Sequence, residues 1–127
     1  MQFIPSTQAL PAHALHLANT EDVQAHAQAI ASHRCLVLHF PAWTDGRAYS
    51  QAVLLRNRLH FSGQLVASGE VLADMLPLLR RCGFSAVQLS AGQSQATAER
   101  ALGFFDGHYQ TAVHAALTAE AEAEAGV

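Results

Sequence analysis

Short apolar runs alternate along this chain with longer stretches in which apolar residues recur at helical spacing. The clearest run, at residues 35–40, is almost wholly hydrophobic and is closed by Pro41. Such a run is typical of a strand covered on both faces, as in a parallel sheet. Weaker apolar runs predict further strands at 3–4, 14–17, 65–67 and 86–89. The first of these is expected to be a short edge strand or an arm.

Helical periodicity fills the intervals between these runs and predicts helices at about 19–34, 48–60, 70–82 and 95–105, with a further segment at 108–117 after Gly107. Asn19 or Thr20 is expected to cap the first helix. Pro77 lies inside the third predicted helix and is expected to kink it, at a cost of about 3 kcal/mol. Gly83 is the expected stop of that helix.

The pattern predicts an α/β fold of four βα units with a mainly parallel sheet, because strands that alternate with helices pair through right-handed crossovers. Both a half-barrel and a small open three-layer sheet fit this order. A half-barrel leaves two unpaired sheet edges, so we expect a homodimer. Residues 1–117 are predicted to form a single domain, and 118–127, rich in Ala and Glu, a disordered tail.

Composition narrows the classes of partner. With 127 residues, half of them hydrophobic, and a net charge of −3, the chain should be one globular domain with no general attraction for nucleic acid or an anionic membrane. It contains no lysine, so an anion site must use Arg, His or backbone amides. Cys35 and Cys82 are expected as two reduced thiols. No signal segment or apolar run of about 20 residues occurs, which favours a cytoplasmic protein without a membrane contact.

Polar side chains of several kinds gather in residues 41–50, directly after the best strand. Ligands of parallel α/β folds bind beyond the carboxyl ends of the strands. We therefore expect an anion-binding corner here, in which Asp45 caps the next helix, Gly46 makes the turn and Arg47 supplies a guanidinium beside free amides. The predicted ligand-binding residues are Asp45, Arg47, Tyr49, Ser50, Arg56, Glu70 and Asp74.

A purely structural interpretation fits the same residues. In this interpretation Asp45 only caps the next helix, and Arg47 pairs with Asp45, Glu70 or Asp74. Arg56 can equally bind carbonyls at a helix end or lie in solvent.

Other chemistries find no support. The eight histidines show no His-Glu-x-x-His spacing, and the cysteines lack partners at zinc spacing, so no metal is predicted. Fingerprints of dinucleotide, P-loop and Gly-x-Ser-x-Gly sites are missing, so no cofactor and no catalytic residue is predicted.

One set of residues resembles a known family over about residues 15–109: Asp45, Gly46, Arg47, Tyr49, Ser50, Ala52, Leu55, Arg56 and Arg58, then Gly63, Ala67, Gly69, Val71 and Asp74, then Arg81, Cys82, Gly83 and Phe84. This pattern is similar to the bacterial family numbered nine-three-four among the domains of unknown function. Such proteins are commonly encoded beside sulfite reductase and labelled as oxidoreductase components of sulfite reduction. Val66 and Met75 stand where an Arg and a Gln are usual, so two polar groups that would face the expected site are replaced.

The resemblance implies an accessory component of assimilatory sulfite reduction, with sulfite reductase as its partner. Two alternatives stay open: an enzyme acting on a small sulfo- or phospho-compound at the same corner, and a structural dimeric subunit.

Overall fold

The computed structural model describes residues 1–107 and the side chains of residues 1–103, so the predicted segment at 108–117 and the tail at 118–127 lie outside the described part. One sheet holds five strands: β1 (Gln2–Ile4), β2 (Leu15–Leu17), β3 (Cys35–Phe40), β4 (Gln64–Gly69) and β5 (Ala86–Gln88). The helices are α1 (Ala27–Ala31), α2 (Arg47–Asn57), α3 (Leu76–Cys82) and α4 (Gln95–Gly107). Two 3₁₀ turns, η1 (Val23–His26) and η2 (Ala73–Met75), lead into α1 and α3.

The strand order is β1-β5-β4-β3-β2, and every pairing is parallel, which confirms the predicted α/β class. From β2 to β5 each strand lies beside its neighbour in the chain, as in half of a barrel. The predicted edge strand at the start of the chain is also formed, since β1 pairs with β5.

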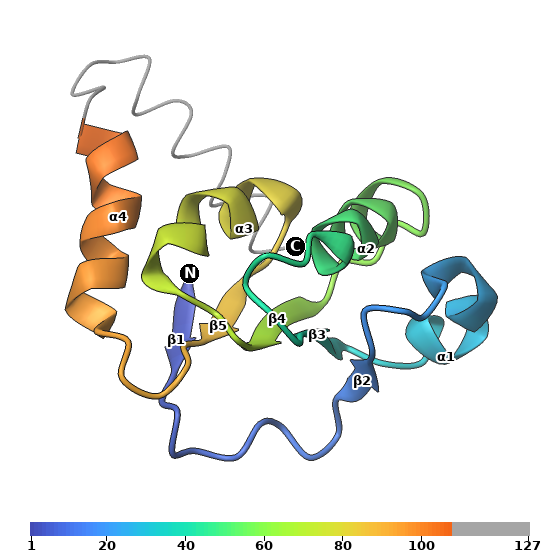
Figure 1. Cartoon of the computed structure of the whole chain (residues 1–127). Coiled ribbons are helices and arrows are strands. Elements are labelled where there is room, and N and C mark those ends of the chain that lie inside the picture. The colour runs from blue at the N-terminus through green and yellow to red at the C-terminus, as the bar shows by residue number, and fades with distance from the viewer. Residues whose placement is uncertain (108–127) are drawn as a thin grey trace.

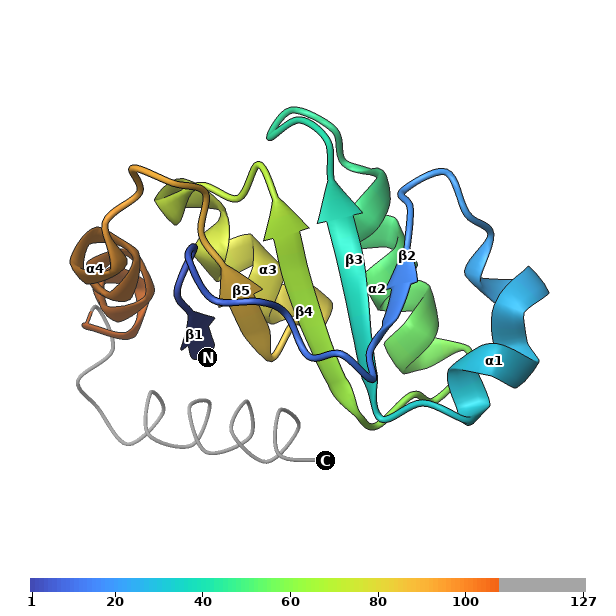
Figure 2. The ribbon, with the colours of Figure 1, turned by 90° about the horizontal axis from the view of Figure 1, so that it is seen from below.

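Within residues 1–107, helices cover only one face of the sheet. Helices α2 and α3 lie side by side on that face, α4 lies at the β1 end and α1 at the β2 end (Figures 1 and 2). On the other face the segment between β1 and β2 crosses the strands (Figure 2). The described part of the chain therefore does not form the three-layer alternative.

Two apolar clusters hold the sheet, one on each face. The larger lies under the helices and includes Leu36, Leu38 and Phe40 of β3, none of which is exposed. The smaller lies on the other face, where Leu10 and Ala14 of the crossing segment pack against Ile4, Cys35, Val37, Val66 and Ala86. Strand β3 is thus covered on both faces, as its unbroken apolar run predicted.

The first predicted helix was too long. The observed helical segment follows Asp22, whose carboxylate caps η1 by accepting a hydrogen bond from the Gln24 amide at 3.0 Å. The segment ends with α1 at Ala31. Neither Asn19 nor Thr20 caps it. The side-chain amide of Asn19 instead donates a hydrogen bond to Asp45, in the loop after β3.

The predicted kink at Pro77 was wrong. Leu72 is extended, η2 follows it, and α3 begins only at Leu76, so Pro77 lies in the first turn of α3. A proline there loses no helical hydrogen bond, because the first amides of a helix have no partner within it. Gly83 ends α3 with φ +107°, as expected for a left-handed helix terminus.

Candidate functional site

The loops after β2 and β3 meet at Asp45. The side-chain amide of Asn19 donates to Oδ2 of Asp45 at 2.6 Å, and the backbone amide of Arg47 donates to Oδ1 at 3.0 Å. The Asp45 carboxylate therefore accepts one of the free amides at the start of α2, but the N-cap residue is Gly46, which provides no side-chain cap. The expected gathering of polar groups at the carboxyl ends of neighbouring strands is present here.

Gly46 is not required by its conformation. It adopts φ −90° and ψ 0°, which other residues adopt freely, and no atom lies within 4 Å of the position that a Cβ would take. The expectation that the turn needs a glycine was therefore wrong.

Arg47 begins α2 and extends into solvent. Its Nε lies 3.8 Å from Oδ1 of Asp45, which is too long for a hydrogen bond, and its side chain is 64% exposed. The contacts expected from the purely structural interpretation are thus present. The Asp45 carboxylate accepts an amide at the start of α2 and lies near the Arg47 guanidinium. They leave most donors of the guanidinium available to an external group.

Tyr49 is turned away from Arg47. Its ring meets Phe40 edge-on, with 5.1 Å between the ring centroids. Two positions along a helix correspond to about 200° of rotation, which separates the two side chains. Burial, and secondarily the nearby Cys82 thiol, raises the pKa of the Tyr49 hydroxyl. Ser50 is exposed on the outer side of α2, so these two hydroxyls do not converge with the guanidinium.

Arg56 lies at the other end of the strands from Asp45, where their amino ends meet. Its Nε and Nη2 donate to the Gly83 carbonyl at 3.0 and 2.8 Å, and Nη1 donates to the carbonyls of Phe61 and Gly63 at 2.9 and 2.7 Å. Gly63 and Gly83 precede β4 and β5, so these bonds join the amino ends of the strands. Burial lowers the pKa of the guanidinium. The structure therefore does not bring Arg56 to the predicted corner, and its contacts match the carbonyl-binding alternative.

Glu70 and Asp74 lie at the same edge as Arg47 but form no ion pair with it among the contacts of residues 1–103. Glu70 directly follows β4, and its amide donates to the Phe40 carbonyl at 2.8 Å. Asp74 is exposed in η2.

The two departures from the family pattern also lie away from the corner. Val66 is fully buried in the middle of β4, on the face that the crossing segment covers. Met75 is buried at the end of η2, and its sulfur accepts a bond from the Leu72 amide at 3.2 Å. Neither position faces Arg47, contrary to the expectation from sequence.

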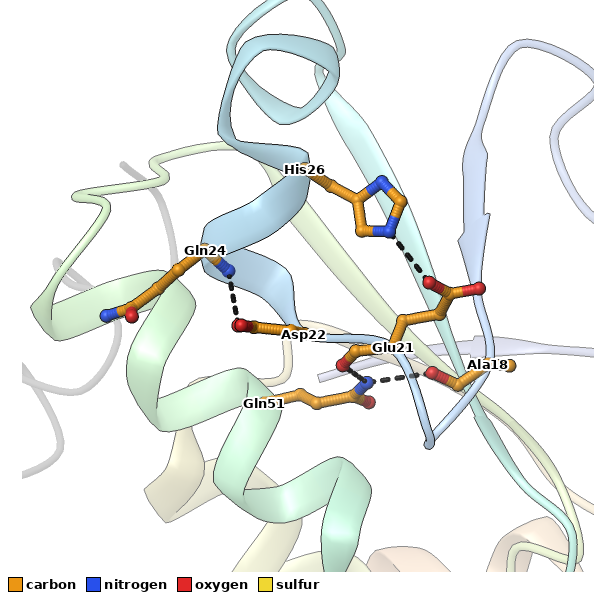
Figure 3. Close-up of polar contacts among 6 residues, drawn as sticks. All are labelled: Ala18, Glu21, Asp22, Gln24, His26 and Gln51. Carbon is orange, nitrogen blue, oxygen red and sulfur yellow. Dashed lines mark hydrogen bonds and ion pairs between the residues drawn. The ribbon is translucent and has the colours of Figure 1, made fainter.

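Gln51 is a positioning residue that the sequence analysis missed. It is 5% exposed, and its Nε2 donates to the carbonyls of Ala18 and Glu21 at 2.8 and 3.0 Å, which holds the loop after β2 against α2 (Figure 3). Its Oε1 is buried without a partner among the described residues. The available signal was a glutamine flanked by Ala48, Ala52 and Leu55 on the inward side of a predicted helix.

The same loop carries an exposed pair. Nε2 of His26 lies 2.7 Å from a carboxylate oxygen of Glu21 (Figure 3). Elsewhere in residues 1–103, no cluster of three or more His, Cys, Asp or Glu side chains is placed to hold a metal. None of the described helices has the length and apolar character needed to cross a membrane.

Residues 14–119 match the family model described as "Bacterial protein of unknown function (DUF934)". The chain belongs to the DUF934 family. The DUF934 match takes in β2 to α4 and every residue of the corner, and it leaves β1 outside. No curated protein and no solved structure matches the chain.

Proposed function

We propose that this DUF934 protein is a non-catalytic accessory component of assimilatory sulfite reduction, and that its corner binds an acidic group through Arg47. The association with sulfite reductase rests on what the sequence resemblance implies. The observation that supports the binding role is the exposure of the Arg47 guanidinium beside a carboxylate whose two oxygens already accept hydrogen bonds.

The position of Asp45 decides which acidic group fits. Its carboxylate already occupies the positive end of α2, so a small free anion would meet its charge at close range. A carboxylate or sulfo group approaching from solvent reaches the outer side of the guanidinium, where two parallel charge-assisted hydrogen bonds can form. The corner is thus better suited to an acidic group on a larger molecule than to an enclosed substrate.

Trp43 supports a protein partner. It lies four positions before Arg47 and is 54% exposed, more than the other exposed large apolar residues of the described chain, Val53 and Leu78. Tryptophan and arginine are the residue types that most often dominate the binding energy of protein interfaces. The enzyme alternative draws no support from the corner, because Tyr49 and Ser50 do not converge with Arg47.

The test is binding of the purified chain to sulfite reductase from the same bacterium, measured by calorimetry. We expect Arg47→Ala to weaken binding by about tenfold, the loss of about 1.4 kcal/mol expected for a solvent-rimmed charged hydrogen bond. The matched control is Arg58→Ala, another exposed arginine that lies at the far end of α2 and should bind as the wild type does. If the wild-type chain does not bind sulfite reductase, the accessory role is wrong.

A further inference from the structure

Helices α2 and α3 present an apolar seam on the outside of the protein. Val53 is 39% exposed and Leu78 is 40% exposed, and with Trp43 they are the exposed large apolar side chains of the described residues. Val53 lies one turn after Tyr49, and Leu78 lies one turn before Cys82. Val53 also lies one turn before Arg56, whose guanidinium reaches the Gly83 carbonyl next to Cys82, so both exposed side chains border the line where α2 and α3 pack together.

The Arg56–Gly83 contact fixes how far the two helices are shifted along each other. Arg47 lies nine positions before Arg56, and Asp74 lies nine positions before Gly83. Both helices run from the carboxyl edge of the sheet to the amino edge, so the cation and the acid stand at the same end of this face (Figures 1 and 2). Asp74 is exposed, and among residues 1–103 its side chain has no hydrogen bond or ion pair.

We propose that the acidic group bound by Arg47 is the Asp74 carboxylate of a second copy of this chain, in a two-fold dimer formed by the outer faces of α2 and α3. This inference rests on the proposed role of Arg47 and names its partner. A two-fold axis along the seam, parallel to both helices, places each α2 over the α3 of the other copy with the same ends aligned. Arg47 of each copy then faces Asp74 of the other, and Val53 lies within two positions of the level of Leu78.

Self-complementarity is the reason for choosing a second copy. An isologous interface needs each group to find its complement on the same surface, and here the cation and the acid occupy matching levels, while the two apolar side chains are offset by two positions, or about 3 Å along the helices. The pairing neutralises both charges and covers both exposed apolar groups. The sheet edges, which suggested dimerisation from sequence, are a weaker basis, because β1 and β2 have three residues each and such short edges pair poorly.

The test is sedimentation velocity over a concentration series of the full chain, with Arg47→Asp, Asp74→Arg and the double variant. We expect the wild type to dimerise, each single charge reversal to raise the dissociation constant by about tenfold or more, and the double variant to return close to the wild-type value. Leu78→Glu should also abolish dimerisation. Arg58→Asp, a charge reversal on α2 outside the seam, is the control, and thermal unfolding verifies that each variant is folded.

A monomeric wild type, or a double variant as weakly associated as the single ones, overturns the dimer. Either result leaves the proposed function to be judged by sulfite reductase binding, where Arg47→Ala still has a predicted effect. If Arg47→Ala changes neither self-association nor binding to sulfite reductase, the proposed function itself fails. If Leu78→Glu dissociates a dimer that Arg47→Asp leaves intact, the pairing of Arg47 with Asp74 is wrong.

Discussion

Replacing Arg56 with alanine should destabilise the fold without touching the corner. The side chain makes four hydrogen bonds to three carbonyls, those of Gly83, Phe61 and Gly63, and its guanidinium carbon lies 5.7 Å from the centre of the Phe61 ring. The bonds join the end of α2 to the segments that enter β4 and β5. Their loss therefore loosens three elements at once.

The expected loss of stability follows from the three carbonyl oxygens that lose their hydrogen-bond donors. Three carbonyls without donors cost about 1 kcal/mol each at the lower limit suited to half-buried groups, so Arg56→Ala should lose about 3 kcal/mol. For a domain of this size the melting temperature should fall by about 10–20 °C. Arg56→Lys should lose about half as much, because one ammonium cannot reproduce the fork that spans Gly83 and Gly63.

The assay is urea unfolding followed by circular dichroism. The midpoint should shift while the slope stays constant, which marks a change of stability rather than of compactness. Arg58→Ala, an exposed control two positions further along, should change stability by no more than about 0.5 kcal/mol. An Arg56→Ala variant within about 1 kcal/mol of the wild type would refute the reasoning, since three stranded acceptors cost more than that.

Three further experiments test other features of the fold. Gln51→Glu places a carboxylate against two carbonyls, so burial should raise its pKa in the folded state, and the stability deficit measured by urea unfolding should grow as pH rises from about 4 to 7; an equal deficit at both pH values contradicts this. Gly69→Ala should lower the melting temperature more than Gly92→Ala does. Both glycines have positive φ, but a Cβ at Gly69 would meet the Phe40 carbonyl oxygen, whereas open space surrounds Gly92. Similar melting temperatures for the two variants would disprove the role of the clash. Burial raises the pKa of the thiols of Cys35 and Cys82, so alkylation by iodoacetamide at about pH 8.5 should be slower in the folded protein than in urea, and equal rates would show that the thiols are not shielded.

Strand β3 was predictable because burial on both faces leaves an unbroken apolar run in the sequence. The gathering of loops at the carboxyl edge was predictable too, because parallel strands place their carboxyl ends together, and Asn19 does reach Asp45 there. Neither prediction needed a specific long-range contact, only the period of the pattern and the rules of parallel pairing.

Other features depend on contacts that no local pattern encodes. Arg56 lies far from Gly83 in sequence, so its role at the amino edge depended on the packing of α2 against α3. Pro77 fits both a kinked long helix and the first turn of a short one, and the extended Leu72 decides between them. The inward position of Gln51 could be inferred from its apolar neighbours on α2, but its two acceptors could not, because they belong to the distant loop after β2.

The position of β1 has a consequence for the order of folding. Strand β1 precedes the other four described strands in the chain but pairs with β5, the last of them, whereas β2, β3, β4 and β5 pair with one another in chain order. Contacts between distant segments are slow to form, because a long loop must close first. The four later strands can therefore assemble progressively as they emerge, and β1 can bind only once β5 has left the ribosome, so the N-terminal strand completes the sheet rather than starting it.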